Sequence, residues 1–272
     1  ISDACFRNDK LSLFFAVELI ACFKILKYIF VDDINPNEIL ATTFTRKAAE
    51  ELYSRILGWG DEIKNYLLDN IDDENFDNLL KIDRIDFNQI KIGTTDSVAE
   101  ELLRDNKKPG ENQAIVIEEF VANSAMMRIL IEDETYRNEK LVEFLKELSG
   151  RAELKEPSKM SEILMKIKNR FFYDQVDLEE LYEKTEKGSG QQLALDCIKE
   201  YETTLSKRNT IDFAMLESLF LNKLKNGELE LFLNEVKIVL IDEYQDTNLI
   251  QDDIYFTIAK RALENNGNIT VV

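Results

Sequence analysis

The chain of 272 residues is long enough to bury a full core, and its composition, 44% hydrophobic and 32% charged, is typical of a globular protein. The formal net charge of −19 argues against a protein that coats nucleic acid by bulk electrostatics, although a local basic groove remains compatible with it. Histidine is absent, which excludes serine–histidine triads and histidine metal sites.

The cysteines and the apolar runs bear on the cellular compartment. The chain has three widely spaced cysteines, Cys5, Cys22 and Cys197, which predict reduced thiols and neither a disulfide framework nor a metal site. The most apolar run extends from Leu11 to Phe30, and three charged residues interrupt it. A membrane span needs roughly 20 nearly uncharged residues, so we predict a buried core helix instead. With no signal peptide visible, we expect a cytoplasmic protein without a membrane partner.

The first predicted strand covers residues 38–44 and follows the turn Asn35-Pro36-Asn37. Thr45 should then cap a helix over residues 46–57. Gly58-Trp59-Gly60 is expected to end this helix.

The end of this strand also carries binding chemistry. Thr43, Phe44 and Thr45 open a helix that begins with Arg46, and they offer hydroxyls, amides and an aromatic face. These groups can grip a single-stranded backbone and stack on a base. The alternative is an ordinary capped amphipathic helix that packs on the sheet through its alanines.

A second strand is predicted over residues 89–94, and it enters a helix at Thr95-Asp96-Ser97. A cluster of this kind at a helix start is most often a cap.

The rest of the chain divides by periodicity. Helical spacing dominates as far as about residue 209, and strands are expected to resume only at Lys237. This order predicts an α/β core over residues 1–104 and 211–272, with an all-helical domain inserted over residues 105–210.

The most informative segment is the apolar run over residues 236–241, which is followed at once by Asp242 and Glu243. It predicts a buried strand that delivers two carboxylates to the carboxyl edge of the sheet, where ligands of open α/β folds bind. An Asp there can hold Mg²⁺, and a neighbouring Glu can polarise a water that attacks a phosphoryl group. The alternative is a pair of acids that only cap the next helix.

Several motifs together resemble the UvrD/Rep-like superfamily 1 DNA helicases. Residues 242–246, Asp-Glu-Tyr-Gln-Asp, followed by Gln251, resemble the DEXQD motif of that family. Residues 43–49, Thr-Phe-Thr-Arg-Lys-Ala-Ala, are similar to motif Ia, with Arg46 where the family usually has Asn.

Residues 93–104 are similar to motif Ib, although Asp96 replaces the usual His and Val98 replaces the usual Phe. Stacking of that Phe on a base therefore does not carry over to Val98. The resemblance extends from about residue 34 to residue 272, and it is looser in the helical middle.

The resemblance implies a RecA-like core of the P-loop NTPase type, with ATP and Mg²⁺ as cofactors and single-stranded DNA as partner. It implies that Asp242 holds Mg²⁺, Glu243 activates the attacking water and Gln245 couples the γ-phosphate to the DNA-contacting motifs. The residues that it places against DNA are Thr43, Phe44, Thr45, Arg46, Thr95 and Ser97.

The expected phosphate loop departs from the family pattern, which is Gly or Ala, four residues, and then Gly-Lys-Thr. Ala4 and Lys10 have the spacing of its nucleotide contacts. Asp9 stands where the second Gly is expected, however, and Leu11 stands where the metal-binding Thr is expected. We therefore expect this chain to hydrolyse ATP poorly.

We expect the chain to be part of a longer protein, an ATP-dependent DNA helicase whose second motor domain lies beyond Val272. DNA repair proteins or a helicase–nuclease complex are the further partners that the resemblance implies. The alternative function is a catalytically dead helicase remnant that binds DNA or a protein. A third possible function, another phosphate-transfer enzyme with the same core, is less favoured. Such an enzyme would have no use for the segment over residues 43–49, which suits the binding of nucleic acid.

Overall fold

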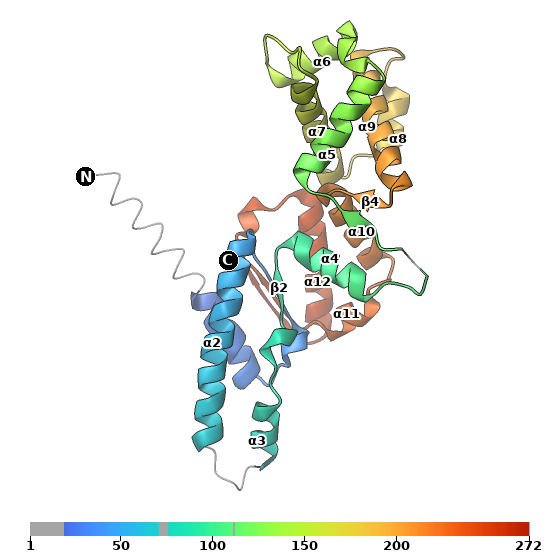
Figure 1. Cartoon of the computed structure of the whole chain (residues 1–272). Helices are drawn as coiled ribbons and strands as arrows, with labels where there is room; N and C mark the ends of the chain where they lie inside the picture. The colour runs from blue at the N-terminus through green and yellow to red at the C-terminus, as the bar shows by residue number, and fades with distance from the viewer. Residues whose placement is uncertain (1–18, 71–75, 111, 272) are drawn as a thin grey trace, which may run out of the picture. The chain divides into compact units, whose positions relative to one another are not determined.

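The computed structural model of the chain describes residues 19–70, 76–110 and 112–271 (Figure 1). The described residues form two compact units. The first comprises residues 19–98, 227–247 and 255–271, and the second comprises residues 99–226 and 248–254. The predicted domain limits at residues 104 and 211 stay a prediction.

A four-stranded parallel sheet, in the order β2-β1-β5-β6, forms the centre of the first unit. Its strands are β1 (Ile39–Thr42), β2 (Lys91–Gly93), β5 (Ile238–Ile241) and β6 (Asn268–Val271). Every residue of β1 and β5 is buried, as expected for central strands of a parallel sheet that is covered on both faces. The predicted α/β class with a parallel sheet is confirmed.

Helices of several lengths surround this sheet. They are a helix over residues 19–30, α2 (Arg46–Asn70), α3 (Phe76–Asp83), α11 (Glu230–Glu235) and the short η1 (Pro36–Glu38), η3 (Phe87–Gln89) and η5 (Tyr244–Asp246). The chain also passes from one unit to the other within α4 (Thr95–Asp105) and α12 (Leu249–Glu264). Cys22 and Ile25 of the first helix are fully buried in the core, as expected for that part of the apolar run. Among the described helices, none combines the length and the apolar character that a membrane span requires.

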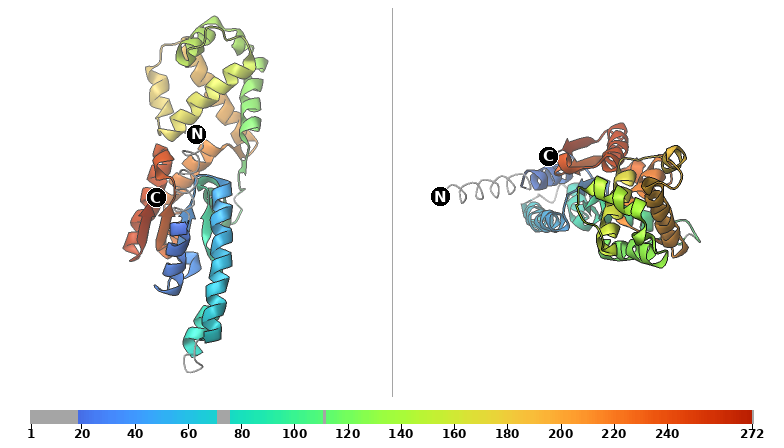
Figure 2. Two further views of the ribbon diagram at one scale, coloured as in Figure 1. Left: turned by 90° about the vertical axis from the view of Figure 1, so that its left-hand side faces the viewer. Right: turned by 90° about the horizontal axis from the view of Figure 1, so that it is seen from above.

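Helix α2 is longer than predicted, and Figure 2 shows it as the long helix of the first unit. The prediction that Gly58-Trp59-Gly60 ends it is wrong, because each Gly costs a helix only about 1 kcal/mol. Gly60 instead permits a close approach, since a Cβ built there would lie 2.6 Å from Cζ of Phe87. Gly58 has no atom within 4 Å of the same position. Packing against η3 therefore decided the outcome.

The second unit is mostly helical. Its helices include α5 (Glu119–Glu132), η4 (Thr135–Arg137), α6 (Glu139–Ser149), α7 (Pro157–Tyr173), α8 (Leu178–Lys184), α9 (Gly190–Lys207) and α10 (Phe213–Lys225). Their core contains side chains with no solvent exposure, namely Met126, Leu130, Leu141, Leu145, Met160, Leu164 and Tyr201.

A small parallel sheet in the second unit pairs β3 (Ile115–Val116) with β4 (Thr210–Ile211). The prediction that strands resume only at Lys237 is therefore wrong. Strands of two residues are too short to show an alternating pattern in the sequence.

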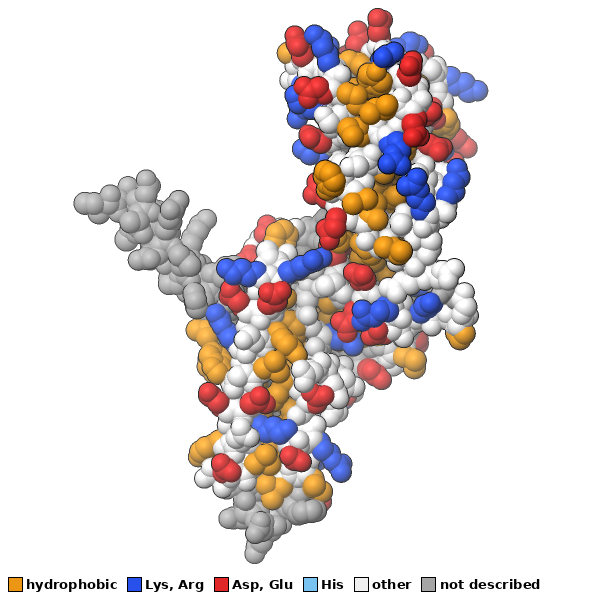
Figure 3. All heavy atoms as spheres, viewed as in Figure 1, with side chains coloured by type: hydrophobic (Ala, Val, Ile, Leu, Met, Phe, Trp, Pro, Cys, Tyr) orange, Lys and Arg blue, Asp and Glu red, His pale blue; other side chains and the backbone are white. Residues whose placement is uncertain are grey.

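The surface carries charges of both signs. Figure 3 shows acidic and basic side chains interspersed over the face that it presents. Some of them pair, as Lys237 does with Glu38 at 2.7 Å in the first unit. This mixture agrees with the interpretation that the chain does not coat nucleic acid by bulk charge.

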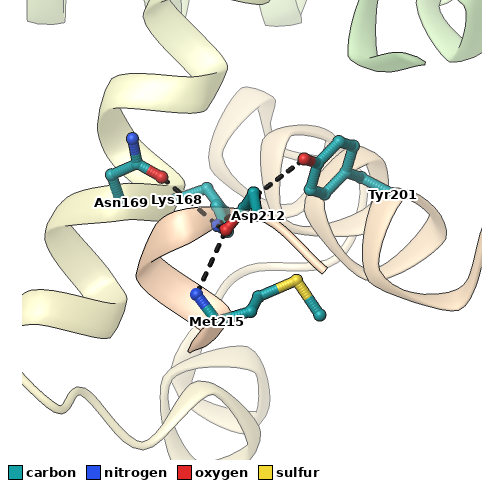
Figure 4. A network of polar contacts seen from close by, with 5 residues as sticks. All are labelled: Lys168, Asn169, Tyr201, Asp212 and Met215. Carbon is teal, nitrogen blue, oxygen red and sulfur yellow. Dashed lines mark hydrogen bonds and ion pairs between the residues drawn. The ribbon is translucent and has the colours of Figure 1, made fainter. Parts of the chain in front are cut away.

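A buried ion pair lies inside the second unit (Figure 4). Nζ of Lys168 is 2.5 Å from both carboxylate oxygens of Asp212. The Tyr201 hydroxyl donates to Asp212 at 2.7 Å, and the backbone N–H of Met215 donates at 3.1 Å, so that Asp212 also caps α10. Burial lowers the pKa of Lys168, and attraction to Asp212 opposes this shift. The network joins α7, α9 and α10.

The two described cysteines are free thiols, Cys22 and Cys197, and both are buried. Burial raises the pKa of Cys22 to about 11 and that of Cys197 to about 12. Both are therefore protonated at neutral pH and poor nucleophiles. The reduced state of the thiols stays a prediction, and Cys5 lies outside the described residues.

Candidate functional site

Three segments that are far apart in the sequence end at one edge of the sheet. Thr42 is in register with Gly93 of β2 and with Ile241 of β5. The pairing continues one residue further, since the N–H of Thr43 donates to Gly93 at 3.0 Å and that of Asp242 donates to Thr42 at 2.9 Å. As predicted, β5 is a buried strand that ends at this edge directly before Asp242.

The turn after β5 holds the two acids. Asp242 and Glu243 are both partly buried, and Glu243 has φ 56° and ψ 41°, in the left-handed region. This conformation is uncommon for a residue with a long side chain, and strained positions of this kind concentrate at functional sites. The Gln245 side-chain amide donates a hydrogen bond to the Glu243 carboxylate. Two of the predicted catalytic side chains therefore lie in contact.

The last Gln of the acidic motif has a structural role in the second unit. Gln251 and Asn248 form a reciprocal cap at the start of α12, with the N–H of Gln251 donating to Oδ1 of Asn248 at 2.9 Å. The Gln251 side chain also donates to Glu217 of α10 at 2.6 Å, and only 2% of Glu217 is exposed. The cap thus fixes the helix that follows the acidic turn.

The segment from Thr43 to Arg46 has three exposed residues, and both of its threonine hydroxyls bond within the protein. Phe44 is 60% exposed, and Thr45 and Arg46 are also exposed. The buried Thr43 hydroxyl donates to the Thr45 carbonyl at 3.0 Å, while Thr45 Oγ1 accepts from the N–H of Ala48 at 3.1 Å. The predicted Thr45 cap is confirmed.

The cluster that opens α4 is also engaged internally. Thr94 is the cap, because its hydroxyl accepts from the N–H of Ser97 at 3.3 Å. The Ser97 hydroxyl donates back to the Thr94 carbonyl at 2.9 Å. Thr95 is only 8% exposed, and its hydroxyl lies 2.6 Å from that of Tyr255. Val98 is buried in the core, as expected of a residue that does not stack on a base.

Sequence reasoning missed Tyr255 and Glu217. Tyr255 lies 160 positions from its partner Thr95, and Glu217 lies 34 positions from Gln251. No local pattern reports a hydrogen bond over such a separation. The one available signal was helical periodicity, which places Tyr255 on the buried face of α12.

The site is compatible with a nucleotide-bound Mg²⁺ and unsuited to an ion held by protein alone. Among the described residues, no group of three or more acids or cysteines could hold a metal. Mg²⁺ in nucleotide sites is usually held by one or two carboxylates together with phosphate oxygens and water, a role that Asp242 fits. The other predicted nucleotide contacts, Ala4 and Lys10, lie outside the described residues, as do Asp9 and Leu11.

Comparison with known proteins defines the class. Residues 20–272 match the family described as the UvrD/REP helicase N-terminal domain. The chain therefore belongs to this family, and its parallel sheet with inserted helices is a RecA-like core.

Three relatives illustrate the similarity. The chain is 29% identical, over 92% of its length, to a probable DNA helicase II homolog of Mycoplasma capricolum. It is 24% identical over 88% of its length to the ATP-dependent DNA helicase SRS2 of Saccharomyces cerevisiae. It is 30% identical over 42% of its length to one subunit of the ATP-dependent helicase/nuclease of Staphylococcus epidermidis. The matches span 29%, 19% and 10% of these relatives, respectively.

Proposed function

We propose that the chain supplies the ATP-binding and hydrolysis region of an ATP-dependent DNA helicase that moves along single-stranded DNA. The observation that carries this proposal is the meeting of Asp242 with the Thr43 segment at one sheet edge, where the N–H of Asp242 bonds to Thr42, the residue before Thr43. Two of the three relatives described above are named as ATP-dependent, which supports ATP as the energy source.

At the acidic turn, each residue has a distinct role in this proposal. Asp242, at the end of a buried strand, holds Mg²⁺. Glu243 polarises the attacking water, and its left-handed backbone turns the chain out of the strand direction. Gln245 contacts Glu243 and senses the γ-phosphate position. ATP supplies the phosphoryl group that is transferred to water. Ala4 and Lys10 complete the nucleotide contacts.

DNA contact is assigned to the starts of α2 and α4. Phe44 offers a stacking surface and Arg46 offers a cation for the backbone. The side-chain hydroxyls of Thr43, Thr95 and Ser97 are engaged within the protein, and the backbone N–H groups of Thr43 and Ser97 also donate within it. Of these three residues, Thr95 would therefore contact DNA through its backbone N–H group, whereas Thr43 and Ser97 would hold the two helix starts in shape. The Thr45 hydroxyl already accepts from the N–H of Ala48, so Thr45 would also contact DNA through its backbone N–H group.

The wider assembly is part of the proposal. A second motor domain of the same parent chain would close over the nucleotide, and residues 105–210 would act as the helical insertion. The helicase/nuclease proteins among the relatives support a helicase–nuclease complex or other repair partners. We place the protein in the cytoplasm.

The second candidate function is that of a helicase remnant, which binds DNA or protein without hydrolysing ATP. The observation that favours it is the altered phosphate loop, with Asp9 and Leu11 in place of Gly and Thr. A carboxylate there repels the β-phosphate, and Leu11 cannot ligate a metal.

Binding of a fluorescent ATP analogue separates the two functions. With Mg²⁺ present, Asp242→Ala should weaken binding at least about tenfold, or about 1.4 kcal/mol, because the metal loses its protein ligand. Without Mg²⁺ the two proteins should bind alike. Glu235→Ala is the matched control, since it removes an equal charge from an exposed residue just before the same strand. If wild type shows no binding up to about 1 mM nucleotide, its binding free energy is weaker than about −4.1 kcal/mol, and the remnant function would be established.

Stacking by Phe44 is tested with a fluorescent single-stranded oligonucleotide. Phe44→Ala should weaken binding by about 1–3 kcal/mol, the usual contribution of one base stacked on an aromatic ring. Phe256→Ala is the control, because Phe256 is 62% exposed and Phe44 is 60% exposed. Equal dissociation constants for wild type and Phe44→Ala in an anisotropy titration would remove Phe44 from the DNA contact.

A further inference from the structure

Tyr255 of α12 contacts both of the segments that the proposed function uses. Its hydroxyl lies 2.6 Å from that of Thr95, and the two residues are 6% and 8% exposed. Its ring centroid lies 6.5 Å from that of Tyr244, with the rings inclined at 47°. All three residues belong to the first compact unit.

Each contact reaches the first residue of an element. Thr95 begins α4, directly after the cap residue Thr94. Tyr244 begins η5, between Glu243 and Gln245. A single side chain therefore touches the start of the helix assigned to DNA and the turn assigned to the nucleotide.

The hydrogen bond between Tyr255 and Thr95 has no solvent alternative, because both hydroxyls are buried. Breaking a buried hydrogen bond costs free energy, so a shift of α4 that breaks this bond is unfavourable. Tilted aromatic pairs similarly have preferred separations. Movement at either segment thus changes the position that is most favourable for the other.

We propose that Tyr255 is a positioning residue that couples DNA binding to nucleotide binding through Thr95 and Tyr244. The proposal rests on the proposed function, because it assigns a regulation to that same site. Coupling between two binding sites is reciprocal, and it commonly changes each affinity about 5–150-fold. Tyr255 touches neither ligand, so its effect appears in the coupling and not in the separate affinities.

Tyr255→Phe tests this with minimal disturbance, because it removes one hydroxyl and keeps the ring against Tyr244. The quantity to measure is the coupling factor, the ratio of the dissociation constants for single-stranded DNA without and with a non-hydrolysable Mg²⁺–ATP analogue. In the wild type we expect a factor of at least about five. In Tyr255→Phe the coupling factor should fall to about two or less. The affinity for DNA alone and the affinity for the nucleotide alone should each stay within about twofold of the wild-type value.

Two further variants sharpen the result. Thr95→Val removes the other hydroxyl at constant shape and should lower the coupling factor equally, and the double variant should lower it no further. Tyr53→Phe is the matched control, since the Tyr53 hydroxyl makes an equally short bond of 2.6 Å to Asn88, in an exposed position of the same unit. It should leave the coupling factor unchanged.

The outcomes separate the two proposals. A wild type that binds both ligands, with a coupling factor that Tyr255→Phe leaves intact, overturns the role of Tyr255 and leaves the proposed function standing. The same holds if wild type binds both ligands without coupling, or if Tyr255→Phe lowers thermal stability and nothing else. A wild type that does not bind the nucleotide overturns the proposed function, and the coupling with it.

Discussion

Replacing Lys168 with Met should lower the free energy of unfolding by about 3–5 kcal/mol, the usual result of leaving one member of a buried ion pair alone. Asp212 would keep its hydrogen bonds from Tyr201 and Met215 but would lose the cation that balances its charge in the network of Figure 4. Urea denaturation followed by circular dichroism would measure the change. Because the network lies in the second unit, the helical signal should report it directly.

Lys166→Met is the control for this experiment, because Lys166 is an exposed residue of the same helix. It should change the free energy of unfolding by less than about 0.5 kcal/mol. Adding Asp212→Asn to Lys168→Met should restore part of the loss, since the uncompensated charge is then removed. Equal stability of Lys168→Met and wild type would show that the pair adds no stability.

Gly267→Ala should be the most damaging small substitution that we identify in the first unit, with a loss of about 3 kcal/mol. A Cβ at Gly267 would meet the carbonyl group of Lys237, whose carbon would lie 2.5 Å away. These are backbone atoms, and the same carbonyl accepts a hydrogen bond of 2.8 Å from the N–H of Asn268. The start of β6 would therefore have to move away from β5.

The comparison for this substitution is Gly58→Ala. Gly58 lies inside α2 with no atom within 4 Å of its Cβ position, so Ala should raise stability by about 0.5–1 kcal/mol. Thermal unfolding of the two variants should thus shift in opposite directions. A melting temperature that Gly267→Ala leaves unchanged or raises would show that the carbonyl of Lys237 moves aside easily.

The features that the sequence predicted correctly depend on neighbours along the chain. The apolar run before Asp242 forms β5, and Thr45 caps α2, because both outcomes follow from residues only a few positions away. The parallel arrangement followed from the alternation of strands and helices. Burial of β1 and β5 on both faces agrees with their apolar residues, which only Thr42 at the end of β1 interrupts.

The errors arose where distant residues decide the outcome. Local rules end α2 at Gly58, whereas packing of Gly60 against Phe87 lets it continue. The pairing of β3 with β4 joins segments almost a hundred positions apart, and neither has a pattern of its own. The same applies to the candidate site. Its acids were visible in the sequence, but the internal bonds of Thr95 and Ser97 were not.

The order of the strands also bears on how the chain folds during synthesis. Strand β1 lies between β2 and β5, yet Thr42 of β1 and Leu240 of β5 are 198 positions apart. A ribosome therefore releases β1 and β2 long before β5, the other neighbour of β1, and most of the helical unit emerges in the interval. Contacts over such separations form slowly, because the loop must close before they stabilise anything. The helices can assemble early, while the apolar edge of β1 stays open to chaperones until β5 leaves the ribosome.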